Sequence, residues 1–291
     1  RRIEYTRSLS EKRAFIGESV DLTLQVTNRK ILPLAWLKIE DEFPHGMNLL
    51  NEATISTTLG MDLLVNLLSL RWYERVSWRY RLQCDRRGYY SFGPARLSSG
   101  DLFGLFMQEG RLPSRDALIV YPQIVPIEEF GLPTKEPFGE VKAQQRIFED
   151  PSRTIGVRDY GPGDEFKKIH WKATARHQQL QVKVYEPTTT SQIVIMVNIA
   201  TLPKFWQGVI PERLETTISL VASLAHYAIE RRYQVGVVAN GCWPFSHHPL
   251  KVLPSRDPDQ LTHILEALAV VSSMPTLALE DLLTRESPHL P

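Results

Sequence analysis

The sequence predicts an α+β protein of two domains, an antiparallel β-sandwich followed by a doubly wound α/β domain. Apolar residues alternate with polar ones in the N-terminal part, whereas buried-type strands alternate with amphipathic helices in the C-terminal part. A length of 291 residues accommodates two domains of ordinary size. We therefore assign residues 1–122 to the sandwich, 123–157 to a linker or crossover and 158–291 to the α/β domain.

Two runs of alternating residues carry the sandwich prediction. Residues 20–26 alternate between aliphatic and polar side chains, and Asn28-Arg29-Lys30 ends the pattern. The same alternation returns in residues 78–84, and Arg87-Gly88 after it is typical of a hairpin turn. Short strands separated by Pro and Gly, without a helical period, favour an immunoglobulin-like sandwich.

The α/β prediction depends on four segments. Residues 192–197 form a continuous apolar run, as expected of a strand buried on both faces of a parallel sheet. A helical stripe in residues 211–232 begins at a proline, which suits a first helical position. Residues 234–239 repeat the buried strand, and residues 257–271 repeat the amphipathic helix. Because no further strand follows, we expect a short or truncated sheet.

The densest motif is Arg158-Asp159-Tyr160-Gly161-Pro162-Gly163-Asp164, which leads into residues 169–176. The Gly-Pro-Gly sequence predicts a turn, and Asp164 is placed to cap a helix over residues 165–176. Trp171 lies near the boundary of the apolar face of this helix, so we expect it to be a buried packing anchor.

A basic stripe follows from the same helix. Lys168, Lys172 and Arg176 recur at intervals of four residues and therefore share a face. Two interpretations stay open: the stripe receives an acidic protein surface or a phosphate, or it is a solvated face whose cations pair with neighbouring carboxylates.

Composition limits the remaining classes of function. Lys and Arg number 34 against 33 Asp and Glu, so no global positive field exists to hold nucleic acid. Cys84 and Cys242 form no recognisable pair, which favours a reduced, cytoplasmic setting. No apolar run reaches the roughly 20 residues of a membrane-spanning helix. No hydrolase, P-loop or dinucleotide motif occurs, so we expect no catalysis and no cofactor.

The motif beginning at Arg158 resembles the R-[ED]-Y-x-P-G-D, I-x-W and A-R pattern of the domain of unknown function 58 family, whose activity is not established. The D-L-F-G-L-F sequence at residues 101–106 also resembles this family, and we expect Phe103, Leu105 and Phe106 to fill the sandwich. The resemblance implies a von Willebrand A-like α/β domain. It makes these residues the candidate interaction site: Arg158, Asp159, Tyr160, Pro162, Gly163, Asp164, Lys168, Trp171, Lys172 and Arg176.

A von Willebrand A-like domain usually binds a divalent cation through a D-x-S-x-S sequence after its first strand. In this chain the corresponding positions hold Asn198, Ala200 and Leu202. Asparagine offers one neutral oxygen and the other two side chains offer none, so we expect a degenerate site without bound metal.

The resemblance also implies partners and a location. Members of the family are often encoded with MoxR-type AAA+ ATPases and usually carry two membrane-spanning helices upstream of the part seen here. The chain begins with Arg1-Arg2 rather than Met, so we expect it to be part of a longer, membrane-associated protein with this portion facing the cytoplasm. The leading hypothesis is a non-enzymatic, membrane-tethered adaptor of such an ATPase in the assembly of protein complexes. The alternatives are a cation-dependent adhesion module and, less favoured, a hydrolase acting on phosphate or glycan.

Overall fold

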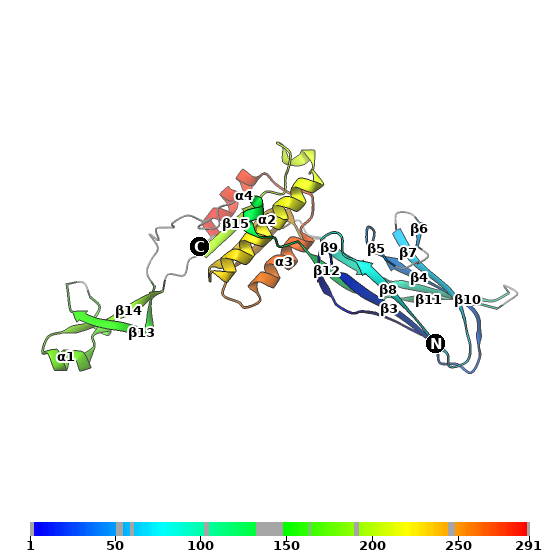
Figure 1. The fold of residues 1–291 in the computed structure, drawn as a ribbon, viewed down its shortest axis with the longest axis horizontal. Coiled ribbons are helices and arrows are strands. Elements are labelled where there is room, and N and C mark those ends of the chain that lie inside the picture. Colours follow the sequence, from blue (N-terminus) through cyan, green and yellow to red (C-terminus); the bar gives the residue numbers. More distant parts are fainter. Residues whose placement is uncertain are drawn as a thin grey trace.

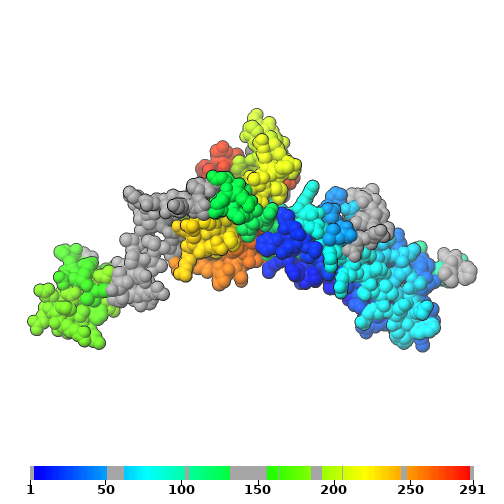
Figure 2. All heavy atoms as spheres, in the orientation of Figure 1, coloured from blue at the N-terminus to red at the C-terminus, as the bar shows by residue number. Residues whose placement is uncertain are grey.

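The computed structural model describes residues 3–50, 55–58, 61–101, 105–131, 148–162, 164–188, 192–243 and 248–289. The chain is a strand-rich mixture of α and β structure with several antiparallel sheets. Figure 1 shows three parts, namely a sandwich, a helix-covered α/β unit and a separate two-stranded arm. In Figure 2 the sandwich, blue to cyan, and the arm, green, lie at opposite ends of the α/β unit.

The sandwich is built from three sheets, whose strand orders are β1-β3-β8-β5, β11-β10-β4-β7-β6 and β2-β12-β9. Neighbouring strands are antiparallel, except that β2 and β12 run parallel. The strands are β1 (Ile3–Leu9), β2 (Arg13–Phe15), β3 (Ser19–Asn28), β4 (Leu34–Phe43), β5 (Asn48–Leu49), β6 (Ile55–Thr58), β7 (Met61–Leu70), β8 (Arg75–Gln83), β9 (Gly88–Phe92), β10 (Ala95–Gly100), β11 (Met107–Leu112) and β12 (Asp116–Tyr121).

The alternation in the sequence places one face of each long strand in the core. Along β3, Leu22 and Leu24 are fully buried, while the polar residues between them are partly exposed. Burying a leucine side chain contributes about 2 kcal/mol, so this face holds the strand in its register. The antiparallel arrangement predicted for this part of the chain is present.

The D-L-F-G-L-F segment does not fill the sandwich. Leu105 and Phe106 are exposed in the turn between β10 and β11, and Phe103 lies outside the described residues. The expectation of a core plug was therefore wrong for Leu105 and Phe106. A hydrogen bond contributes to this placement: the Asp101 carboxylate accepts the Phe106 N–H at 2.8 Å and holds Phe106 in the connection to β11, outside the core.

The α/β unit has a three-stranded sheet in the order β15-β16-β17. Strands β15 (Gln192–Val197) and β16 (Gln234–Cys242) are parallel, as predicted, and β17 (Pro249–Ser255) adds an antiparallel edge. Strand β16 is buried along most of its length, whereas β15 lies at the other edge of the sheet and is only partly buried, so the expectation of burial on both faces was wrong for β15. Strand β17 was not among those predicted. It contains two prolines, which are atypical of strand interiors but are tolerated at a sheet edge. The sheet is therefore not purely parallel.

Helices α2 (Pro211–Glu230) and α3 (Gln260–Val270) pack against each other and against this sheet, and α4 (Leu279–Glu286) follows. Lys251 of β17 reaches Glu286 of α4 at 2.6 Å, which ties that last helix to the edge strand. Short 3-10 turns occur at Ile127–Phe130, Phe205–Gln207 and Ser287–His289. None of the helices in the described part of the chain combines the length and apolar content that crossing a bilayer requires.

The arm consists of the antiparallel strands β13 (Phe148–Asp159) and β14 (Gln181–Thr188), joined through a 3-10 turn (Phe166–Lys168) and helix α1 (Trp171–His177). Figure 1 shows it apart from the α/β unit. The predicted boundary between residues 157 and 158 falls inside β13. The signature motif thus lies on the arm, outside the α/β core in which it was placed.

Strand β12 joins the sandwich to the α/β unit by serving both cores. Leu118 and Val120 are buried in the sandwich core, whereas the alternate residues Ile119 and Tyr121 pack in the core formed by α2, α3 and the β15-β16-β17 sheet. Successive side chains of a strand point to opposite faces, so one strand can do both. Tyr121 also lies 3.5 Å from Glu266 of α3 through its hydroxyl.

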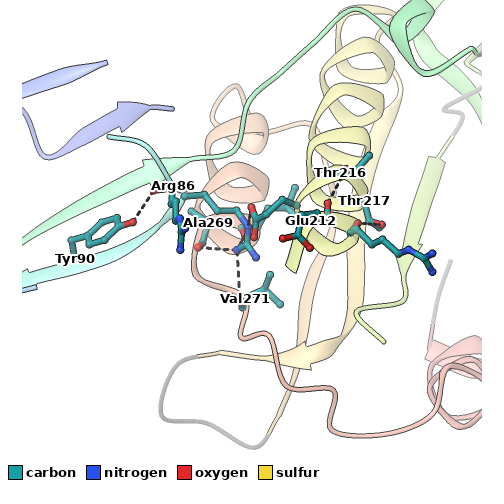
Figure 3. Close-up of polar contacts among 11 residues, drawn as sticks. Arg86, Tyr90, Glu212, Thr216, Thr217, Ala269 and Val271 are labelled. Atoms are coloured by element: carbon teal, nitrogen blue, oxygen red, sulfur yellow. Dashed lines mark hydrogen bonds and ion pairs between the residues drawn. The ribbon is translucent and has the colours of Figure 1, made fainter. Parts of the chain in front are cut away.

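A buried arginine closes the same junction. Arg87, in the turn before β9, donates to the carbonyl oxygens of Leu268, Ala269 and Val271 at 2.8, 3.2 and 3.4 Å, and its Nε lies 2.9 Å from Glu215. Burial lowers the pKa of Arg87, and the Glu215 carboxylate opposes that shift. Figure 3 shows Ala269 and Val271 at the end of α3 facing the sandwich turn. A cation at a helix C-terminus complements the helix dipole.

Candidate functional site

The turn of the signature motif is held by an ion pair. The Arg158 guanidinium donates to both oxygens of Asp164 at 2.6 and 2.8 Å, and the Gly161 N–H donates to Asp164 Oδ2 at 2.8 Å. These donors lower the pKa of Asp164, the Arg158 contact most strongly. Pro162 occupies the second position of the turn, where its fixed φ is favoured, and the Asp164 N–H closes it onto the Gly161 carbonyl at 3.1 Å. Gly163 lies outside the described residues.

Asp164 does not cap a helix, which corrects the prediction. The segment after it forms only a 3-10 turn, and α1 starts at Trp171 instead of Glu165. The cap is His170, whose Nδ1 accepts the Ala173 N–H at 3.0 Å. The carboxylate of Asp164 is already engaged by Arg158 and Gly161, so it is not available to a helix terminus.

A small set of contacts orders the rest of the arm. Ile169 and Val182 are buried and face each other in an isolated bridge between the loop and β14. Gln181, also buried, donates to the Asp159 carboxylate through its side-chain amide. The Tyr160 ring packs on Phe166 at a centroid distance of 5.8 Å. The loop that carries the motif is therefore fixed by polar and apolar contacts of its own.

Two large aromatic side chains of the arm face solvent. Trp171 is 67% exposed and Phe166 is 74% exposed. The expectation that Trp171 is a buried anchor was therefore wrong. The exposure of Trp171 follows from the helix boundary, because Trp171 is the first residue of a seven-residue helix on a two-stranded arm. Among the described residues, no second layer covers its ring.

The basic stripe is divided between two elements. Lys172 and Arg176 are exposed, one turn apart on α1, as their spacing predicts. Lys168 ends the 3-10 turn and is partly buried, so it does not continue that row. The exposed Lys167 precedes it. The arm thus presents cations and aromatic rings on the same small structure.

The residues predicted to occupy a degenerate cation position follow directly after the end of β15. Asn198 Oδ1 accepts the Ala200 N–H at 3.1 Å and the Asn240 side-chain amide at 2.9 Å. Asn240 is fully buried, and its own Oδ1 accepts the Ile199 N–H at 2.6 Å. Leu202 follows in the loop and carries no donor or acceptor in its side chain. In the described ranges no three His, Cys, Asp or Glu side chains are grouped so that they could hold a metal ion.

The role of Asn240 was missed from the sequence, where Asn240-Gly241 indicates a strand end. A signal was present: Asn198 and Asn240 each follow a run of apolar residues, and the parallel pairing of β15 with β16 ends directly before them, at Val197 and Ala239. Two asparagines at such positions predict an amide-to-amide hydrogen bond. The exposed position of Phe166 was missed too, because it depends on where the helix begins.

Comparison with known proteins agrees with the resemblance in the signature motif. Residues 156–284 match the profile of a family described as protein of unknown function DUF58. Over 275 residues the chain is 25% identical to the uncharacterized protein YeaD of Bacillus subtilis (strain 168), which aligns 93% of this chain with 63% of that protein. The chain thus spans less than two thirds of the length of this relative.

Similarity to solved structures is weak. The CARDB domain of the PF1109 protein from Pyrococcus furiosus matches 40% of this chain and 93% of its own at a TM-score of 0.28 and 9% identity. A cohesin module from a family 33 glycoside hydrolase of Clostridium perfringens matches 40% of this chain and 96% of its own, at 0.26 and 12%. TM-scores this low do not establish a common fold.

Proposed function

We propose that this protein is a non-enzymatic interaction module whose arm binds an acidic protein surface, and that a MoxR-type AAA+ ATPase is the partner it serves in assembling protein complexes. The observation that carries the proposal is the exposure of Trp171 and Phe166 beside Lys167, Lys172 and Arg176. Tryptophan and arginine are enriched among the residues that dominate protein interfaces. Covering one large aromatic ring removes about 150–250 Å² from water.

The order of the arm supports binding through a preformed surface. The Arg158–Asp164 pair, the Gly161 N–H and the Gln181–Asp159 contact fix the loop before any partner arrives. A loop that is already ordered loses less conformational entropy on association, so more of the contact energy appears as affinity. The cations would speed the encounter with an acidic partner, and their effect would weaken as salt rises.

The alternatives find less support. A cation-dependent adhesion site needs oxygen ligands directed at the ion, whereas Asn198 Oδ1 accepts from two N–H groups.

We also propose that the α/β unit is a shortened von Willebrand A-like domain and that an upstream segment anchors the whole protein to the membrane.

The test is binding of the chain to a purified MoxR-type ATPase from the same organism, measured by biolayer interferometry. We expect Trp171→Ser and the double variant Lys172→Glu with Arg176→Glu each to weaken binding at least tenfold. Trp206→Ser changes an equally exposed tryptophan on the α/β unit and serves as the aromatic control. Arg96→Glu with Arg111→Glu reverses two exposed cross-strand arginines of the sandwich and serves as the charge control.

A photo-crosslinking residue at position 171 gives an independent readout. We expect it to link the arm to the ATPase, while the same residue at position 206 does not. Binding that survives both arm variants, or equal losses in the two controls, would remove the arm from the proposed interaction. Failure of the wild-type chain to bind the ATPase would reject the named partner.

A further inference from the structure

The end of the sandwich farthest from the α/β unit collects three loops. Residues 29–33 precede β4, residues 71–74 precede β8 and residues 105–107 lead into β11. The strand register places them together, because Leu34 pairs with Leu70 and Trp36 pairs with Gly100. We call these three loops the distal end; the label N in Figure 1 marks this side of the sandwich.

Hydrogen bonds fasten two of the loops to each other. The buried Asn28 donates from Nδ2 to the carbonyl oxygens of Leu32 and Arg71 at 3.0 and 2.8 Å. The Tyr73 N–H donates to the Lys30 carbonyl at 3.2 Å. These loops therefore form one surface with a fixed shape.

The distal end as a whole is apolar where it meets solvent. Its large hydrophobic side chains are between 62% and 77% exposed: Ile31, Leu32, Trp72, Tyr73, Leu105, Phe106 and Met107. Single exposed hydrophobic residues are common, but a group of them on one end of a domain marks an interaction surface.

The backbone at Tyr73 strengthens that interpretation. Tyr73 has φ of 53°, in the left-handed region that favours glycine and costs other residues of the order of 1 kcal/mol or more. Its side chain stays exposed, so folding does not recover that cost by burying the ring. A bulky aromatic residue kept in a strained, exposed turn position indicates a role outside the fold.

The charges around the apolar group select the kind of partner. The three loops contain three cations, Arg29, Lys30 and Arg71, against one carboxylate, and Arg75 follows at the start of β8. That carboxylate, Glu74, accepts the Arg71 N–H at 2.6 Å, and at the margins Glu4 pairs with Arg29 and Asp101 accepts from Phe106. Trp and Tyr beside Arg and Lys is the combination found at the interface of a lipid bilayer.

We propose that the distal end contacts the surface of a membrane that contains anionic phospholipid. Trp72 and Tyr73 insert their rings at the headgroup level together with Ile31 and Leu32, while Lys30 and Arg71 meet the lipid phosphates. Each such cation contributes about 1 kcal/mol near an anionic surface, and the apolar side chains add to it by leaving water. The distal end shares no residue with the arm that is proposed to bind a protein, so an experiment can reject either proposal without rejecting the other.

Flotation of the chain with phospholipid vesicles tests the site. We expect binding to phosphatidylcholine vesicles that contain about 30% phosphatidylglycerol, and at least tenfold weaker binding to phosphatidylcholine alone. Trp72→Ser with Leu32→Ser is expected to reduce binding at least tenfold, as is Lys30→Glu with Arg71→Glu. Tyr73→Gly removes a ring at a position where glycine fits the backbone, so its loss of binding cannot be attributed to misfolding.

The controls are Trp206→Ser and the arm variant Lys172→Glu with Arg176→Glu, which we expect to bind vesicles as the wild type does. Absence of vesicle binding by the wild type overturns the proposal, as does binding that the distal-end variants leave intact. Sedimentation that reveals a dimer broken by the same variants would make this end a self-association surface, which also overturns it.

Discussion

Replacing Arg87 by methionine removes the cation that joins the sandwich to the α/β unit and keeps most of the side-chain volume. The guanidinium bonds three carbonyl oxygens at the end of α3 and the carboxylate of Glu215, and its side chain is only 7% exposed. Hydrogen bonds from a charged donor contribute about 1.5–3 kcal/mol each, and a cation at a helix C-terminus adds up to about 2 kcal/mol. The desolvation of Arg87 offsets much of this sum.

We therefore expect Arg87→Met to lower the free energy of unfolding by about 3 kcal/mol, as breaking a buried charged contact usually does. Glu215→Gln is expected to cost less than about 1 kcal/mol, because the Glu215 side chain is 48% exposed and its attraction is screened by water. Urea unfolding followed by far-UV circular dichroism measures both values. If the junction fails before the domains unfold, the transition of Arg87→Met should separate into two phases.

Arg86→Met is the matched control, because Arg86 is the exposed neighbour of Arg87. Its backbone carbonyl accepts the Tyr90 hydroxyl at 2.8 Å, and the substitution leaves that hydrogen bond in place. We expect this variant to stay within about 0.5 kcal/mol of the wild type. The reasoning is refuted if the free energy of unfolding of Arg87→Met also stays within about 1 kcal/mol of the wild type. It is refuted as well if Arg87→Met is destabilised but small-angle scattering shows the same shape for Arg87→Met and Arg86→Met.

Three further outcomes can be checked. Asn240→Leu leaves the buried Ile199 N–H without its acceptor and is expected to cost about 1–3 kcal/mol in urea unfolding. A cost below about 0.5 kcal/mol would show that the amide pair contributes little. The pKa of Asp164 is lowered in the folded arm, so its ion pair stabilises the arm above the ordinary aspartate pKa of 3.8 and is lost as the pH falls through the lower folded pKa. The NMR chemical shift of the Gly161 amide, which donates to Asp164, should therefore titrate with a midpoint below pH 3.8. A midpoint above that pH contradicts the ion pair. Tyr73→Gly is expected to leave thermal stability unchanged or raise it by up to about 1 kcal/mol, and a clear loss would mean that the ring supports the fold.

The sequence predicted those parts of the fold whose signal is local. The period of two in β3 and β8 and the helical stripe of α2 each arise from one face packing against a core, so a window of ten to twenty residues contains the pattern. The parallel pair β15 and β16 was likewise indicated by apolar runs without alternation.

The arm was not predictable in the same way. Its strands pair residues that are separated by the whole signature loop, such as Arg158 with Val182 and Asp159 with Gln181, and no local period announces that pairing. The position of Trp171 depended on a helix start that Asp164 appeared to supply by residue type. Because Arg158 engages the Asp164 carboxylate, helix α1 is capped by His170 instead and begins at Trp171, whose ring is exposed to solvent.

The shared strand β12 couples the orientation of the sandwich to that of the α/β unit. Leu118 packs in one core and Tyr121 in the other, so the two parts are connected by a hydrogen-bonded strand instead of a flexible linker. A tilt of the sandwich is therefore expected to move α3 with it. Separation of the chain after residue 122 would remove Ile119 and Tyr121 from the α/β core and leave both side chains uncovered on the sandwich. A change in the orientation of the sandwich is therefore expected to shift the helices that pack on Ile119 and Tyr121.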